Sequence, residues 1–117
     1  DCYEVLREAQ HAGVVAARAG VPAHEVDRAA RDVIASAGLG PNFIHRLGHG
    51  IGIEEHEDPY LVAGNTTPLV PGHAFSVEPG IYFSGRFGMR LEDIVVVRPD
   101  GPEALNTVDH ALAVVEA

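Results

Sequence analysis

Three histidines lie close together in one glycine-rich segment of the sequence. His45, His49 and His56 fall within residues 45–57, HRLGHGIGIEEHE, beside a run of acidic residues. Glycines alternating through such a run weaken a strand, unless backbone or substrate must approach closely there. A lone histidine is more often structural than functional. Three of them beside carboxylates instead favour a metal site, and this mixture of donors suits Zn, Mn, Co or Fe.

Two carboxylates farther along the chain are surrounded by apolar residues. Glu78 lies in AFSVEPGIY and Glu92 lies in MRLEDIVVV. A buried carboxylate needs a cation, a metal or hydrogen-bond donors, because burying it unpaired is costly. Arg90 precedes Glu92 by two residues, so the two side chains share one face of a strand and could form an ordinary surface ion pair. Taken together, however, His49, Glu78 and Glu92 predict a metal site built on a sheet.

The elements that must position these residues begin with two helices. Apolar residues at steps of three and four predict amphipathic helices over residues 1–19 and about 23–37, joined as an antiparallel hairpin. Gly20 is expected to end the first helix, and Gly38 with Gly40 the second.

A β-type pattern follows Pro41. It predicts strands at residues 43–44, 74–77, 81–83, 89–97 and 103–105, a surface loop over 58–72, and a turn at Pro-Asp-Gly, residues 99–101. Residues 111–115 fit either a last strand or a helical turn. The predicted fold class is therefore α+β, a helical hairpin followed by a mainly antiparallel sheet.

Composition excludes several classes of protein. The 117 residues suit one domain, and 46% apolar with 21% charged residues is typical of globular proteins. The net charge of −9 argues against nucleic acid or an anionic membrane as a partner. No apolar run approaches the ~20 residues that span a bilayer. The single cysteine, Cys2, excludes an internal disulfide, is expected to serve packing, and fits a cytoplasmic location.

Three segments also carry a family resemblance. HRLGHGIGIEEHEDP, SVEPGIY and MRLEDIVVV resemble, in order and spacing, the signatures of the pita-bread (creatinase/aminopeptidase-fold) metallopeptidases. The helical segment VPAHEVDRAARDVI matches too, so the resemblance covers essentially the whole chain. Methionine aminopeptidases share the GHGIG and HE elements. Arg-x-Glu-Asp at 90–93 and His45-Arg46 are instead similar to the Xaa-Pro dipeptidase (prolidase) and aminopeptidase P branch. Glu55 departs from the β-branched apolar residue usual at its position.

The resemblance implies two divalent metal ions, with Mn the first expectation and Co, Zn or Fe as alternatives. His49 and Glu78 match ligands of one metal, and Glu92 matches a carboxylate that bridges both. Two further aspartate ligands, spaced Asp-x10-Asp, are expected upstream of Asp1. The chain is accordingly expected to be the C-terminal portion of a single catalytic domain, with the hairpin at about 1–38 and the metal-site sheet at about 41–117, and to be inactive alone.

The resemblance also implies the reaction and its remaining residues. His56 matches the histidine that contacts the substrate carbonyl and shuttles protons, and His45 matches one that helps stabilise the tetrahedral intermediate. Arg90 matches a residue that orients the bridging carboxylate and its neighbourhood. The expected reaction is hydrolysis, by metal-activated hydroxide, of peptides with proline at the second position. The full-length protein is expected to be a homodimer. His11, His24, His73 and His110 match no catalytic position and are expected to be structural or surface residues.

Several alternatives stay open on the sequence alone. Within enzymes, the chain could belong to a methionine aminopeptidase, and a metal-independent creatinase-type enzyme has less reason to keep His49, Glu78 and Glu92 together. From another class, a pita-bread module could bind peptides or proteins without catalysis. The residues do not distinguish a dipeptidase from an aminopeptidase.

Overall fold

The computed structural model describes residues 1–116, and it begins with two helices where apolar residues recur at helical spacing. Helix α1 (Cys2–Ala16) starts at Asp1, whose carboxylate accepts the backbone N–H groups of Tyr3 and Glu4 at 2.8 and 3.2 Å. Such a cap satisfies donors that have no partner within the helix.

Helix α2 (Ala23–Ser36) starts after Pro22, at the position where a missing N–H has least effect. Its first N–H groups, from Ala23 and His24, donate to the carbonyl oxygens of Thr67 and Asn65 at 2.9 and 2.8 Å. The loop that follows the second strand therefore caps this helix. Neither helix is long and apolar enough to cross a membrane.

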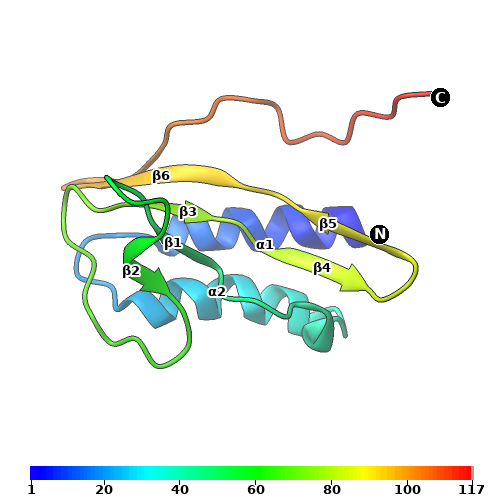
Figure 1. Ribbon diagram of the computed structural model, residues 1–117, viewed down its shortest axis with the longest axis horizontal. Coiled ribbons are helices and arrows are strands. Elements are labelled where there is room, and N and C mark those ends of the chain that lie inside the picture. The colour runs from blue at the N-terminus through cyan, green and yellow to red at the C-terminus, as the bar shows by residue number, and fades with distance from the viewer. Residues whose placement is uncertain (117) are drawn as a thin grey trace.

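The strands follow a short 3₁₀ turn, η1 (Gly40–Asn42). They are β1 (Gly48–Gly50), β2 (Glu57–Leu61), β3 (Ala74–Val77), β4 (Gly80–Phe83), β5 (Phe87–Arg90), β6 (Asp93–Arg98) and β7 (Gly101–Ala104). Five of them form an antiparallel sheet in the order β2-β1-β3-β6-β7, while β4 and β5 pair as a separate hairpin. This hairpin extends beyond one end of the sheet (Figure 1).

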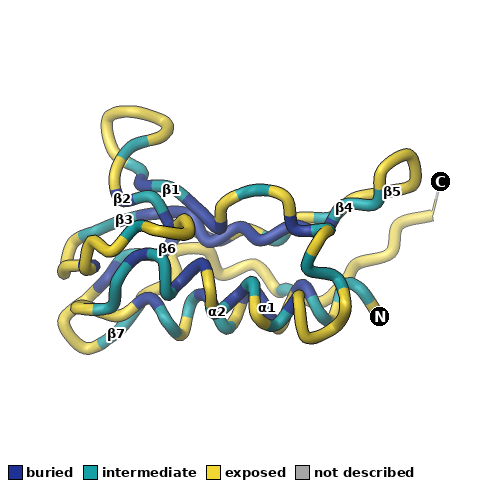
Figure 2. The backbone as a smooth tube through the Cα atoms, turned by 90° about the horizontal axis from the view of Figure 1, so that it is seen from below, coloured by how far each residue is buried: buried dark blue, intermediate teal, exposed yellow. Residues whose placement is uncertain are grey.

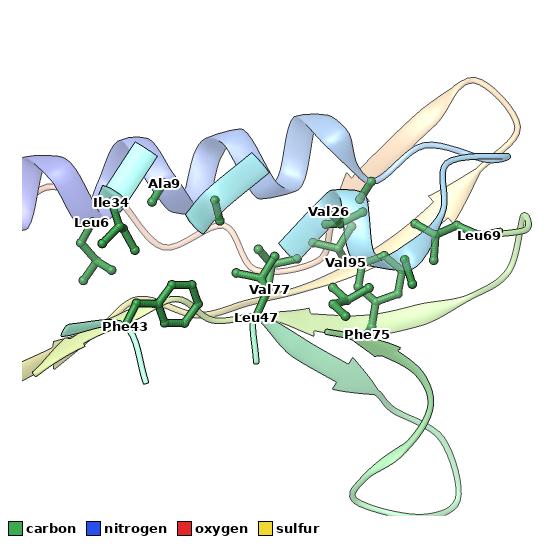
Figure 3. Packing of buried hydrophobic residues seen from close by; sticks show 14 of the residues in the cluster. Leu6, Ala9, Val26, Ile34, Phe43, Leu47, Leu69, Phe75, Val77 and Val95 are labelled. Atoms are coloured by element: carbon green, nitrogen blue, oxygen red, sulfur yellow. The ribbon is translucent and has the colours of Figure 1, made fainter. Parts of the chain in front are cut away.

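The two helices pack side by side against one face of the sheet and make a two-layered structure (Figure 2). Small residues allow this close packing: a Cβ at Gly13 of α1 would lie 3.0 Å from Val77 Cγ1 and 3.2 Å from Leu47 Cδ2. Between the layers lie buried apolar side chains from both helices and from the sheet, among them Leu6, Ala9, Val26, Ile34, Leu47, Phe75, Val77 and Val95 (Figure 3).

Several predicted boundaries are wrong. Residues 89–97 are not one strand, because the chain leaves the β4–β5 hairpin at Leu91–Glu92 and joins the large sheet at Asp93. Residues 43–44 are irregular rather than extended in a ladder, and part of the predicted loop 58–72 belongs to β2.

The chain ends also differ from expectation. Helix α1 ends at Ala16 rather than near residue 19, and Gly20, with φ 88°, lies in the turn beyond it. The sheet ends at Ala104, and residues 105–116 form neither the strand nor the helical turn considered for 111–115. The prediction of a helical hairpin followed by a mainly antiparallel sheet is confirmed.

Candidate metal centre

The three predicted ligands meet where strands end. His49 lies in β1, Glu78 in the two-residue link between β3 and β4, and Glu92 in the link between β5 and β6. Strand β3 pairs with β6 so that Val77 lies opposite Asp93, which brings the two glutamates together just past the last paired residues. One ligand atom from each of the three side chains lies within 4.8 Å of the others. The sequence predicted the cluster, but the strand predicted over residues 89–97 placed Glu92 inside a strand rather than in a link between two.

Glu78 is the buried member of this cluster, with 8% of its surface exposed. Its Oε2 lies 3.2 Å from His49 Nε2, and its Oε1 accepts from Arg90 Nη1 at 3.1 Å. Arg90 also donates from Nε to the Tyr82 hydroxyl at 2.8 Å. The guanidinium therefore orients Glu78, a neighbour of the expected bridging carboxylate Glu92.

The two carboxyl groups have unequal pKa values. Burial works to raise the pKa of Glu78, but hydrogen bonds with Ser76 and Glu92, and the charges of His49 and Arg90, outweigh it and lower that pKa. Burial, a hydrogen bond with Glu78 and the charge of Glu78 together raise the pKa of Glu92. Two carboxylates this close cannot both ionise easily without a cation. The pair thus favours a positive ion between its members.

The two remaining histidines face the same pocket. It has a volume of about 450 Å³, and it is lined by His45, His49, His56, Glu78 and Arg90, among others. His56 ends the loop 51–56 between β1 and β2, and its ring contacts that of His49 edge-on, with centroids 4.3 Å apart. Of the three predicted histidines only His49 lies in a strand. His45 lies in the irregular segment before β1, and His56 lies in the loop after it.

His45 lies in the irregular segment before β1 and is one of the residues that line the pocket. Its Nδ1 lies 2.7 Å from the Arg46 carbonyl oxygen, and because a carbonyl can only accept, Nδ1 carries the proton. Its Nε2 is buried and has no hydrogen-bond partner within residues 1–116. Burial lowers the pKa of His45, so the neutral ring is favoured and Nε2 is an unshared acceptor.

The donor set fits a divalent transition metal. An imidazole and two carboxylates converge from three separate chain segments, and borderline ions such as Mn, Zn, Co and Fe accept this mixture. Further donors would be needed to complete a coordination sphere, since the described residues bring only these three together.

Sequence reasoning missed two residues that support the site. The Ser76 hydroxyl accepts the backbone N–H of His49 at 3.1 Å and also hydrogen-bonds with Glu78. The Tyr82 hydroxyl accepts from Arg90. Ser76 stands two residues before Glu78, so the two-residue alternation of strand β3 is a signal that could have identified it.

Two histidines that do not line the pocket, His73 and His110, have hydrogen-bond or ion-pair partners elsewhere in the fold. His73 Nδ1 accepts the Val70 N–H at 3.2 Å within a turn. His110 Nε2 lies 3.0 Å from Asp93 Oδ2, and Asp93, 4% exposed, also accepts from Gln10 Nε2 at 3.0 Å. These contacts tie the C-terminal segment and α1 to the start of β6.

Comparisons with known proteins agree with this geometry. Over 97% of its length the chain is 58% identical to a probable dipeptidase PepE of Mycobacterium tuberculosis. It is 50% identical to an Xaa-Pro dipeptidase of Lactobacillus helveticus over 98% of its length. The crystal structure of dipeptidase PepE from Mycobacterium ulcerans superposes with a TM-score of 0.93 at 59% identity, and 94% of the chain is covered.

The chain spans 30% of the M. tuberculosis protein, 31% of the L. helveticus protein and 30% of the M. ulcerans chain. The close superposition shows that the helical hairpin and antiparallel sheet are part of the pita-bread fold of these peptidases. The model of metallopeptidase family M24 matches residues 1–99, and the chain belongs to this family.

Proposed function

We propose that the complete protein containing this chain is a metal-dependent exopeptidase that hydrolyses peptide bonds at Xaa-Pro. The observation that carries this proposal is the convergence of His49, Glu78 and Glu92 within 4.8 Å, beside a pocket that also receives His45 and His56. The relatives named dipeptidase PepE and Xaa-Pro dipeptidase support the substrate class.

In this proposal His49 and Glu78 would hold one divalent ion, and Glu92 would help to hold both. The two aspartates that the resemblance adds to the set belong to the part of the complete protein outside residues 1–117. Two divalent ions, when bound, generate hydroxide from water at neutral pH and polarise a carbonyl group. The pKa values of Glu78 and Glu92 support a metal site between these two residues. Without a cation, burial and the neighbouring Glu78 together raise the pKa of Glu92, and a bound cation would favour the ionised form of both carboxyl groups.

Three other residues of the pocket have supporting roles in this proposal: Arg90 orients a metal ligand, and His56 and His45 act on the substrate. Arg90 fixes the carboxylate of Glu78 through its 3.1 Å hydrogen bond, which leaves the opposite oxygen facing His49. His56 is exposed and at the rim of the pocket, where its ring can reach a peptide carbonyl and exchange protons with water. His45 lines the pocket, and its Nε2 is buried without a hydrogen-bond partner among residues 1–116. In the neutral ring this nitrogen can only accept a hydrogen bond, and stabilising an oxyanion would require the protonated ring.

The test is a comparison of substrates on the complete protein. Purified protein loaded with Mn²⁺ is assayed on a Gly-Pro dipeptide, a Gly-Pro-Ala tripeptide and a Met-Ala-Ser tripeptide. The proposal expects cleavage of one or both proline peptides, and the dipeptide-to-tripeptide ratio then distinguishes a dipeptidase from an aminopeptidase. Preference for Met-Ala-Ser would indicate a methionine aminopeptidase. Binding of the peptides without turnover, with metal absent by elemental analysis, would indicate a non-catalytic module.

A further inference from the structure

The segment that carries His45 has no regular structure of its own. Residues 43–47 lie between η1 and β1 and belong to no helix or strand. A ladder therefore does not fix the backbone at His45, although this residue lines a pocket where small displacements matter. Something outside the sheet has to hold this segment.

Helix α2 supplies that support through Arg31. Its Nη1 donates to the Phe43 carbonyl oxygen at 2.9 Å, and its Nη2 donates to the His45 carbonyl oxygen at 2.8 Å. The guanidinium also lies over the Phe43 ring, 4.0 Å from the centroid, and this ring in turn meets the His45 imidazole edge-on at 5.0 Å. One side chain thus holds the backbone of His45 and the aromatic wall against which its ring packs.

Asp27, one turn earlier on α2, keeps Arg31 in place. It accepts from Arg31 Nε at 3.0 Å and from Arg31 Nη2 at 3.2 Å, and it is only 2% exposed. Its Oδ1 also accepts the backbone N–H of Leu47 at 2.9 Å, a donor shared with the Leu61 carbonyl at 3.0 Å. The Asp27 carboxylate loses its water on folding, whereas the Arg31 side chain stays 35% exposed. Removing a charge from water offsets much of the attraction within the pair, so its main consequence is the geometry it imposes.

We propose that Arg31, held by Asp27, is the positioning residue that fixes the His45 ring at the wall of the substrate pocket. The pair holds the backbone before and after His45. Arg31 donates to the carbonyl groups of Phe43 and His45, and Asp27 accepts the N–H of Leu47. This inference rests on the proposed function, because it gives His45 a catalytic task. Neither Arg31 nor Asp27 lines the pocket itself, and Arg31 reaches it only through its hydrogen bond to His45, so the metal ligands are expected to stay in place.

The test variant is Arg31→Lys in the complete protein. A lysine ammonium keeps the positive charge beside Asp27, but it lacks the planar fork that reaches the carboxylate and two carbonyl groups at once. We expect kcat on the proline peptide to fall about 10- to 100-fold, as a misplaced catalytic group would cause, with KM changed less than about threefold. Metal content should stay at the wild-type level. Selective ¹⁵N labelling of histidine should show a shift of the His45 ring signals, assigned by their loss in His45→Gln.

The matched control is Arg28→Lys, one turn earlier on the same helix. Arg28 is 66% exposed and makes only surface ion pairs, with Glu25 at 3.7 Å and Asp32 at 3.8 Å. This control should leave kcat and the His45 signals unchanged. If Arg31→Lys does not fold, Asp27→Asn takes its place with the same readouts, since it keeps Arg31 and the shape of the side chain.

A double-mutant comparison separates positioning from general destabilisation. In a His45→Gln background, Arg31→Lys should lower kcat by less than about threefold, because the residue it positions is already gone. Equal losses in both backgrounds, or unchanged His45 ring signals, would overturn the inference. If His45→Gln alone retains full kcat, the proposed catalytic role of His45 fails, while the ring signals still decide whether Arg31 positions it.

Discussion

Gly80→Ala is expected to damage the pocket by simple steric contact. A Cβ at this position would lie 2.8 Å from His45 Nε2 and 2.7 Å from Tyr82 Cε2. Ordinary carbon contacts begin near 3.5 Å, so one or both rings must move by about 0.7 Å. Displacing His45 by this amount should lower kcat about 10- to 100-fold. The added methyl group should also cost about 1–3 kcal/mol of stability, as overpacking in a filled site does.

The assay measures kcat and KM on a proline peptide together with the thermal unfolding midpoint and the metal content. Gly40→Ala is the matched control, because its Cβ would meet only Ala35, at 3.5 Å or more, and should change none of these quantities. The steric reasoning is refuted if Gly80→Ala keeps wild-type kcat with unchanged stability. A loss of metal together with a loss of activity would point to the ligands rather than to His45.

Three further predictions test the site and the layers beneath it. Glu78→Gln keeps the side-chain shape but removes the charge that faces His49 and Arg90, so elemental analysis of the complete protein should show at least one metal ion fewer per chain, and turnover should be lost. Gly48→Ala places a Cβ 1.8 Å from the Ser76 carbonyl oxygen, which must separate β1 from β3; unfolding in urea should show a loss of about 3 kcal/mol or more. Phe75→Ala empties a fully buried site and should cost about 3–5 kcal/mol in the same assay, without changing the pH dependence of kcat.

Local patterns were sufficient for both helices and for strands β3 and β4, but they missed β1 and β2. Both helices follow apolar residues at helical spacing, and the turn at Pro-Asp-Gly joins β6 to β7 as predicted. The break at Leu91–Glu92 was not predictable in this way, because MRLEDIVVV contains no glycine or proline and reads as one strand. Pairing with two different partners, β4 on one side and β3 on the other, divides it.

Part of the site was likewise predictable from the sequence, and part of it was not. His49, Glu78 and Glu92 were identified because carboxylates within apolar runs are costly without a cation, and the structure brings them together. Asp27 and Arg31 were not identified, since a pair four residues apart on a helix reads as an ordinary surface ion pair. Only the folded chain shows that Asp27 is buried and that Arg31 reaches across to residues 43–45. Long-range hydrogen bonds of this kind leave no local pattern.

The most direct test of the central claim is to locate the metal in the complete protein. Crystals grown with Mn²⁺ and measured at the manganese absorption edge would give anomalous difference peaks at the bound ions. The account predicts a peak within about 2.2 Å of His49 Nε2 and of a Glu78 oxygen, with Glu92 in contact with it and with a second peak. Anomalous peaks that avoid these three side chains, in protein that cleaves proline peptides with Mn²⁺, would contradict it.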